Sequence, residues 1–246
     1  MEILGIDIGG SGIKGAIVDT KTGEMLTKRL RIPTPQPATP DAIAETIREI
    51  ADAFKYKGPI GCGFPALMQH GVIQTASNID PSCKGVDANA LFSKVTERKV
   101  FVFNDADVAG YAEAKFGIAG KRKGLTMFLT IGTGIGSALI SNGKLIENTE
   151  FGHVYMKNGL KTEHYASDAV RERENLDWQE WGARLNEVLL YLESLFSPDL
   201  FILGGGASKK FELFSNQLQT KAEVLPASLL NKAGIVGAAL LAKKRD

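Results

Sequence analysis

The sequence predicts a two-lobed α/β fold with duplicated mixed sheets, because the same strand, glycine turn and strand pattern opens both halves of the chain. Apolar strands end at a glycine turn at 3–8 and again at 125–131, and another strand follows each turn. Fully apolar strands, typical of sheets that helices cover, lie at 60–64, 100–103 and 200–203. A chain of 246 residues also suits two modest lobes. We therefore expect two related halves with a cleft between them.

The first half is predicted to begin with an antiparallel meander, whose strands lie at 3–8, 13–18 and 24–32. A helix over about 40–56 should follow, because Thr39 can cap it, Pro40 fits its first position and Asp41 is an acid in its first turn. The strand at 100–103 then leads into a helix over 105–117.

The second half repeats this opening, with strands at 125–131 and 135–140 on either side of a glycine turn. A wide apolar stripe from Trp178 to Phe196 predicts a long helix that stops at Ser197. One more strand at 200–203 runs into three glycines at a strand-to-helix turn.

The expected lobes have no Pro/Ser-rich linker between them, so their boundaries should lie at short crossings near Asn104 and Asn231. Residues 1–104 with about 232–246 would form a small N-terminal lobe. Residues 105–231 would form a larger C-terminal lobe.

Charge and hydropathy exclude several classes of protein. The 29 Lys and Arg residues balance 28 Asp and Glu residues, which argues against a protein that coats nucleic acid or an anionic membrane. The hydrophobic fraction of 44% supports a large core, and no apolar run approaches the roughly 20 residues that span a bilayer. The amino terminus lacks a secretory signal pattern, and Cys62 and Cys83 have neither redox-pair nor zinc-ligand spacing. We expect a cytoplasmic protein with reduced thiols and no nucleic-acid or membrane partner.

Three glycine-rich segments at strand ends are candidate phosphate loops, because backbone N–H groups can approach a phosphate where no Cβ intervenes. The candidate donor-binding residues are Gly9, Gly10, Ser11, Gly12 and Lys14, then Thr130, Gly132, Thr133 and Gly134, and finally Gly204, Gly205 and Gly206. Asp7, beside the first loop, is a candidate to hold Mg²⁺ through water. The spacing fits neither the Walker A motif nor the dinucleotide fingerprint. Taken alone, the first segment fits an ordinary glycine-rich hairpin equally well.

In their order, these segments resemble the phosphate, connecting and adenosine segments of the actin, hexokinase and heat-shock-chaperone superfamily of two-lobed phosphotransferases. Within it the chain resembles the ROK family of sugar kinases and sugar-responsive repressors, and in that family the polyphosphate glucokinases. The likeness extends over essentially the whole chain and is carried by NDAD at 104–107, LTIGTGIGSAL at 129–139, NTEFGH at 148–153 and EHYAS at 163–167. The resemblance implies an actin-like ATPase (ribonuclease H-like) fold and a homodimer.

Asp105 is the predicted catalytic base. Phosphoryl transfer to a sugar hydroxyl needs a carboxylate that accepts the hydroxyl proton, and Asp105 follows a buried strand that would deliver it to the cleft. The alternative role is that of an acid at a helix N-terminus, which Asp107 could take instead. The resemblance implies that Asp105 meets the 6-hydroxyl of glucose.

The predicted sugar-binding residues supply carboxylates, amides and an imidazole, which suit a polyhydroxylated ligand. The resemblance implies that Glu150, His153 and Glu163 line the far side of the sugar. Asn104 offers an amide to the sugar hydroxyls. Asn78 matches a sugar-side loop of the family, although an asparagine at this place also fits a plain turn.

The sequence departs from the wider family at its zinc site. In most members the histidine that matches His153 is also a zinc ligand and three cysteines follow it, whereas here residues 154–162 contain no cysteine. We therefore expect no zinc, as in the polyphosphate-type members. The family's repressors place a helix-turn-helix domain before the kinase fold, and this chain begins at its first strand, which disfavours a repressor.

The sequence thus predicts a kinase that transfers a terminal phosphoryl group from inorganic polyphosphate, and optionally from ATP, to the 6-hydroxyl of glucose with Mg²⁺ as cofactor. Two alternatives stay open: an ATP-dependent hexokinase for another sugar on the same fold, and a non-catalytic sugar sensor. Basic clusters are typical of solvated surface, although a long polyphosphate would need some cations outside the cleft; they lie at 28–31, 121–123, 209–210 and 243–245.

Overall fold

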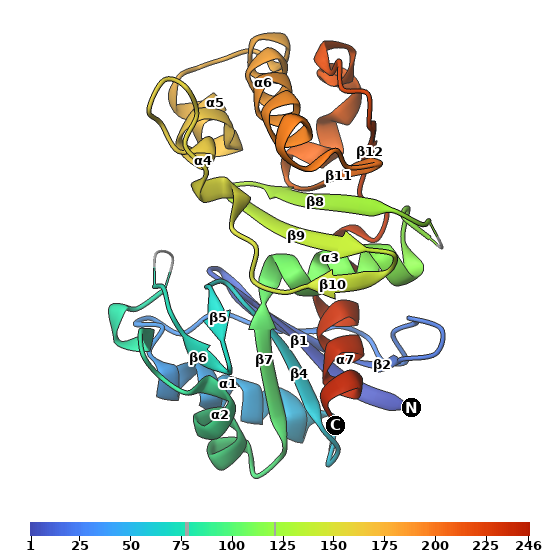
Figure 1. Ribbon diagram of the computed structural model, residues 1–246. Coiled ribbons are helices and arrows are strands. Elements are labelled where there is room, and N and C mark those ends of the chain that lie inside the picture. The colour runs from blue at the N-terminus through green and yellow to red at the C-terminus, as the bar shows by residue number, and fades with distance from the viewer. Residues whose placement is uncertain (77–78, 121) are drawn as a thin grey trace. The chain divides into compact units, whose positions relative to one another are not determined.

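The structure is a computed structural model that describes residues 1–76, 79–120 and 122–246. It contains two compact units, Met1–Ala112 with Asn231–Asp246, and Glu113–Leu230. Each unit is built on a five-stranded mixed sheet (Figure 1). Two candidate residues, Asn78 and Lys121, lie outside the described residues.

The first unit's sheet has the strand order β3-β2-β1-β4-β7. Its strands are β1 (Glu2–Gly9), β2 (Gly12–Asp19), β3 (Leu30–Ile32), β4 (Ile60–Phe64) and β7 (Val100–Asn104). The predicted antiparallel meander is confirmed by the pairing of β1, β2 and β3, while β1, β4 and β7 run parallel. The third strand is shorter than the predicted 24–32: its pairing with β2 is interrupted where the Thr27 side chain accepts the Ile17 N–H at 3.0 Å, and only an isolated bridge between Val18 and Met25 continues it.

Two helices cover one face of this sheet, α1 (Pro40–Ala53) and α2 (Ala88–Thr96) (Figure 1). α1 begins as predicted, with the Thr39 side chain accepting a backbone N–H of the first turn at 3.3 Å. It ends at Ala53, earlier than the predicted 56. Neither α2 nor the elements just before it were predicted. Those elements are the short hairpin of β5 (Met68–Gln69) and β6 (Val72–Ile73) and the 3-10 turn η1 (Pro81–Cys83).

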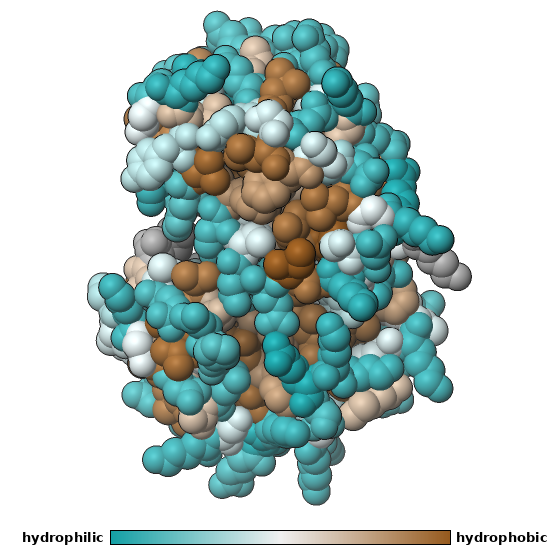
Figure 2. All heavy atoms as spheres, in the orientation of Figure 1, coloured by the Kyte–Doolittle hydropathy of each residue, from teal (hydrophilic) through white to brown (hydrophobic). Residues whose placement is uncertain are grey.

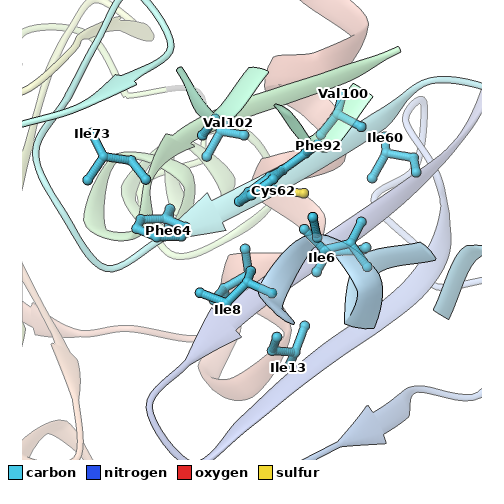
Figure 3. Close-up of a cluster of buried hydrophobic side chains, with 14 of the residues drawn as sticks. Ile6, Ile8, Ile13, Ile60, Cys62, Phe64, Ile73, Phe92, Val100 and Val102 are labelled. Carbon is cyan, nitrogen blue, oxygen red and sulfur yellow. The ribbon is translucent and has the colours of Figure 1, made fainter. Parts of the chain in front are cut away.

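The hydrophobic core of the first unit lies between the sheet and these two helices (Figure 3). Phe64 of β4 packs against Phe92 of α2 with 6.3 Å between ring centroids. Cys62 and Cys83 are both free and buried in this core, and burial raises the pKa of both thiols. Because the thiolate is the reactive form, both cysteines are structural residues.

Helix α7 (Ala233–Arg245) covers the opposite face of the first sheet (Figure 1). It approaches closely because Gly5 of β1 and Gly61 of β4, which are paired, carry no side chain there. A Cβ on either glycine would lie 2.0 Å from a carbonyl oxygen of α7, that of Ile235 or of Ala238.

Helix α3 (Asp105–Phe116) begins in the first unit and ends in the second. The units divide after Ala112, whereas the sequence placed the crossing near Asn104 and expected the first lobe to be the smaller. The start of α3 belongs with the first unit because Val108 packs where Gly63 and Gly237 have no side chain. A Cβ on Gly237 would lie 1.7 Å from the Val108 carbonyl oxygen.

The second unit's sheet has the strand order β10-β9-β8-β11-β12 and repeats the strand directions of the first. Its strands are β8 (Leu125–Ile131), β9 (Ile135–Ser141), β10 (Lys144–Ile146), β11 (Leu200–Gly205) and β12 (Glu223–Pro226). The predicted duplication of a mixed sheet is therefore confirmed.

The α-helices of the second unit are α4 (Thr162–Ala166), α5 (Asp168–Arg173) and α6 (Trp178–Phe196). Its 3-10 helices are η2 (Phe151–His153), η3 (Ala207–Leu213) and η4 (Ser215–Gln217). A further 3-10 helix, η5 (Leu230–Lys232), spans the boundary between the units. α6 confirms the long predicted helix and begins with a capping box formed by Asp177 and Glu180. Its buried residues form the core with the sheet: Trp181, Leu185, Val188, Leu189 and Leu192. Within the described ranges, none of the helices is long and apolar enough to cross a membrane.

Candidate active site

The turn between β1 and β2 is the first glycine segment that the sequence singled out. Gly9 pairs with Gly12 across the hairpin, so Gly10 and Ser11 form the two-residue turn. Asp7 and Lys14 pair three positions before and after this turn, and the Lys14 Nζ lies 3.3 Å from the Asp7 Oδ2. The turn therefore combines exposed backbone with one cation and one carboxylate.

Residues on and just after β3 support this turn through hydrogen bonds, and the sequence analysis did not predict this support. Arg31, opposite Lys14 on β3, donates from Nη2 to the Ser11 carbonyl oxygen at 2.7 Å. Thr34, just beyond β3, donates its hydroxyl to the Gly9 carbonyl oxygen. The sequence assigned the 28–31 cluster to solvated surface, and only strand pairing distinguishes Arg31 from its neighbours.

Asp7 and Asp105 lie at the carboxyl ends of two parallel strands, with β4 between them. Asp7 pairs with Gly63 of β4, and the Asp105 Cα would be 3.7 Å from a Cβ on Gly63. Because neighbouring strands are about 4.8 Å apart, the two backbones are separated by roughly 10 Å. The sheet of the first unit thus brings together the predicted base and the predicted Mg²⁺ carboxylate.

Asn104 caps helix α3. Its Oδ1 accepts the backbone N–H groups of Ala106 at 2.8 Å and Asp107 at 3.0 Å, and its Nδ2 donates to the Ala66 carbonyl oxygen at 3.1 Å. Asn104 therefore caps α3, and the Asp105 Oδ1 also accepts the Ala106 N–H at 2.8 Å, so Asp105 is in addition an acid at the helix N-terminus, the alternative that the sequence left open. The sugar contact predicted for Asn104 stays a prediction, and this buried amide is already bonded to backbone.

Gly234, in the first turn of α7, lies against Asp7. A Cβ on Gly234 would be 3.0 Å from the Asp7 Cγ. No pattern in the sequence indicated that Gly234 would contact Asp7.

In the second unit, two glycine segments lie side by side at one edge of the sheet. The turn Gly132–Gly134 joins β8 to β9, and Gly204 and Gly205 of β11 pair with Thr130 and Ile131 of β8. Gly205 has a φ of +81°, and a Cβ there would lie 2.3 Å from the Ile131 carbonyl oxygen. The structure thus places the second and third predicted phosphate loops next to each other. The segment after Gly206 is the 3-10 helix η3, where the sequence expected a strand-to-helix turn.

Glu150, His153 and Glu163 gather beside these loops in the second unit. The His153 Nε2 lies 3.4 Å from the Glu163 Oε1, and the exposed His164, which the sequence analysis did not single out, lies 3.7 Å from the same oxygen. Burial raises the pKa of Glu150, and the Glu163 charge adds to the increase while His153 opposes it. The cluster offers hydrogen-bond acceptors and an imidazole within a few ångströms, which suits a ligand with several hydroxyl groups.

Strand β9 holds this cluster in place. The Ser137 side chain accepts the Phe151 N–H at 2.9 Å and donates to the Thr149 carbonyl oxygen at 2.7 Å. Gly152 lies on the strand so closely that a Cβ would be 2.0 Å from the Ile135 carbonyl oxygen. The segment that bears Glu150 and His153 is therefore fixed to the strand that begins at the glycine turn.

Residues 1–76, 79–120 and 122–246 contain no group of three or more His, Cys, Asp or Glu side chains that could hold a metal ion. Asp7 was predicted from the sequence to hold Mg²⁺ through water, and this role stays a prediction. Asn78 cannot be placed, because it lies outside the described residues.

Comparison with known proteins gives the class and then the family. The fold is that of the actin-like ATPases. It is similar to that of a ROK family glucokinase from Streptomyces griseus, which was solved in complex with glucose and AMPPNP. The match has a TM-score of 0.84 and 24% identity, over 99% of this chain and 100% of that one. The ROK family model matches residues 3–166. The chain belongs to the ROK family.

Two relatives are more similar. A polyphosphate glucokinase of Mycobacterium tuberculosis is 45% identical over 238 residues, which cover 96% of this chain and 89% of that protein. An inorganic polyphosphate/ATP-glucomannokinase from Arthrobacter sp. strain KM matches with a TM-score of 0.93 and 44% identity, over 100% of this chain and 99% of that one. Both the fold class and the family expected from the sequence are confirmed.

Proposed function

We propose that this chain transfers the terminal phosphoryl group of inorganic polyphosphate, and also that of ATP, to the 6-hydroxyl of glucose. The observation that carries the proposal is the cluster of Glu150, His153 and Glu163 beside the glycine turn that joins β8 to β9, so that candidate sugar-binding side chains lie next to a candidate phosphate loop. The names of the two relatives, a polyphosphate glucokinase and a polyphosphate/ATP-glucomannokinase, support the same donor and acceptor.

Asp105 is the proposed general base. Its carboxylate would accept the proton of the 6-hydroxyl while the hydroxyl oxygen bonds to the terminal phosphorus of the donor. The bond from that phosphorus to the bridging oxygen breaks, and the shortened polyphosphate or ADP leaves with the electron pair. Asp105 suits this role because Asn104 caps the helix and the strand end fixes the backbone of the base.

Mg²⁺ is the proposed cofactor, and Asp7 is the residue that would hold it through water. A bound Mg²⁺ would neutralise charge on the donor phosphates. A single carboxylate fits this ion, because Mg²⁺ keeps several waters and takes its other ligands from substrate phosphates. Lys14, 3.3 Å from Asp7, would contribute a second positive charge to the donor.

Sugar recognition is assigned to Glu150, His153 and Glu163, with Asn104 and Asn78 as further predicted contacts. A sugar analogue that lacks one of the bonded hydroxyl groups would bind more weakly, because it would leave a buried polar group of the site without a hydrogen-bond partner. The donor is assigned to the glycine segments of both units and to Lys14, where backbone N–H groups can meet phosphate oxygens.

A coupled assay for glucose 6-phosphate tests the proposal, with polyphosphate and ATP as separate donors. The expected result is product from both. Product from ATP but none from polyphosphate would contradict the polyphosphate assignment, and a preference for another hexose would favour the alternative hexokinase. Glucose binding without any turnover would favour the sugar sensor.

Salt dependence separates the two donors further. Polyphosphate is a linear polyanion, so more cations contact it than contact ATP, and its activity should fall more steeply with added salt. The residues 121–123 are a candidate outer contact, although Arg122 forms an ion pair with Glu223. Equal salt dependence with both donors would contradict this part of the proposal.

We also propose a cytoplasmic homodimer. The free, buried thiols of Cys62 and Cys83 fit a reducing compartment. Figure 2 shows apolar residues gathered over the region of β8 and β9, and the second unit exposes large apolar side chains, among them Ile146, Leu190, Leu195 and Phe196. Exposed apolar patches are typical of interaction surfaces. Light scattering on the purified chain tests the dimer, and a monomer mass would contradict it.

A further inference from the structure

The turn assigned to the donor also contacts the sugar cluster. A Cβ on Gly134 would lie 2.7 Å from the Glu163 Oε2 and 3.8 Å from its Cδ. The other oxygen of the same carboxylate, Oε1, faces the His153 Nε2 at 3.4 Å. Glu163 therefore stands between the imidazole and the turn, with one oxygen toward each.

The contact depends on one glycine of the turn and not on the other. A Cβ on Gly132 would meet no atom within 4 Å, whereas a Cβ on Gly134 would come closer to Glu163 than such atoms approach in proteins. Gly134 is not in the left-handed region, so its backbone does not require glycine. The reason for glycine at this position is the space that the Glu163 carboxylate occupies.

We propose that Gly134 is a positioning residue of the sugar site: by having no side chain, it lets the Glu163 carboxylate rest against the turn and face His153. This rests on the proposed function, in which Glu163 accepts hydrogen bonds from the sugar. A methyl group at 134 displaces the end of a flexible side chain and no backbone, so the chain keeps its fold while Glu163 moves. The donor turn thereby determines how well glucose binds, even before a donor is present.

The test compares Gly134→Ala with Gly132→Ala, and the readout is the dissociation constant for glucose without donor, measured by calorimetry. A hydrogen bond to a charged group contributes enough that its loss weakens binding about tenfold or more. We expect Gly134→Ala to weaken glucose binding at least about tenfold, and Gly132→Ala to change it less than about twofold. Gly132→Ala is a control for glucose binding without donor only, and not for turnover, because Gly132 is itself assigned to the donor. Thermal unfolding of both variants reports whether the fold is retained.

A double-mutant cycle shows whether the effect passes through Glu163. Glu163→Asp keeps the carboxylate but shortens the side chain by one methylene, which leaves room for the added methyl group. In that background, Gly134→Ala should change the glucose dissociation constant less than about twofold.

Each other result overturns the inference. Equal glucose affinity in the wild type and Gly134→Ala, an equal loss in both glycine variants, or a full loss that persists with Glu163→Asp would each do so. A Gly134→Ala chain that does not fold would also overturn it, because the contact is with a side-chain end. A wild-type chain that binds no glucose would refute the proposed function together with the inference, whereas glucose phosphorylation with an unaltered Gly134→Ala affinity would refute the inference alone.

Discussion

The two units share one strand order but place different chemistry on their first turns. In the first unit the charged residues Asp7 and Lys14 pair close to the turn, and in the second unit the pairs at this place, Thr130 with Gly136 and Leu129 with Ser137, are uncharged. An ion pair thus stands where its counterpart is neutral.

The elements that support the two turns also carry opposite charge. The guanidinium of Arg31 bonds the first turn, whereas the carboxylate of Glu163 stands against the second. The duplicated topology determines where each turn lies, and the neighbouring side chains determine what it can bind. We infer that catalysis depends mainly on charged groups of the first unit and sugar recognition on those of the second.

Replacing the base should have the largest effect. Asp105→Asn is expected to lower kcat by at least about 100-fold, the low end for removal of a general base, while glucose still binds. Steady-state kinetics with calorimetry of glucose binding measure both. The matched control is Asp41→Asn, which removes an exposed carboxylate from the first turn of α1. Near-normal turnover of a folded Asp105→Asn chain would contradict the division of roles.

The close approach of α7 to its sheet distinguishes the first unit, because α6 of the second unit packs on its sheet through large side chains such as Trp181. Gly61→Ala would place a Cβ 2.0 Å from the Ala238 carbonyl oxygen. Overpacking of this kind costs about 1–3 kcal/mol of unfolding free energy. Denaturant unfolding measures it, with Gly10→Ala as control, because a Cβ there meets no atom within 4 Å. Equal stability of the two variants would show that the helix can move away without cost.

Arg31→Ala tests whether the first turn needs its cationic support. Loss of the hydrogen bond to Ser11 should cost about 1 kcal/mol, which corresponds to about a fivefold rise in KM for either donor. Glucose affinity should not change, because Arg31 bonds the turn assigned to the donor and is not among the predicted sugar-binding residues. Arg29→Ala is the control, as an exposed arginine of the same cluster. The same KM in both variants would reject the supporting role.

The smallest expected effect concerns pH. Burial raises the pKa of Glu150 above its ordinary value of 4.5, so ionisation costs the folded state more than the unfolded state. The contribution of Glu150 to stability therefore becomes less favourable as pH rises from about 4 toward 7. Glu150→Gln should unfold at a higher temperature than the wild type at pH 7, and the difference should shrink at pH 4. A difference that does not depend on pH would contradict the raised pKa.

Local signals in the sequence predicted much of the fold. Thr39 and Pro40 define the start of α1, and the glycine turns after β1 and β8 are recognisable because each separates two apolar strands. The predicted strand at 24–32 forms only at Leu30–Ile32: its pairing with β2 is interrupted where the Thr27 side chain accepts the Ile17 N–H, and it resumes as a single bridge between Met25 and Val18. When a side chain takes the place of a backbone group in the hydrogen bonds between two strands, the pattern of apolar residues does not change, so that pattern cannot predict the interruption.

The candidate site divides in the same way. Glu150 and His153 were recognisable because they stand in a short motif, and the structure places them together with Glu163. Arg31 was not, because its contact with Ser11 crosses 20 residues and depends on the pairing of β2 with β3.

The sequence by itself determined the repeated strand, turn and strand openings, the family, and the candidate base Asp105, since each is written in residues that are neighbours along the chain. Only the tertiary structure decided that Asn104 is the cap of α3, that Arg31 supports one turn, and that Glu163 rests against Gly134 at the other. The physical reason is that Asn104, Asp105 and Asp107 all stand near the start of α3, so only the backbone geometry decided which of them accepts both N–H groups of the first turn, and that the Arg31 and Glu163 contacts join segments far apart in sequence. Their geometry is set by strand register and by the space that glycines leave, and neither is encoded in any single motif.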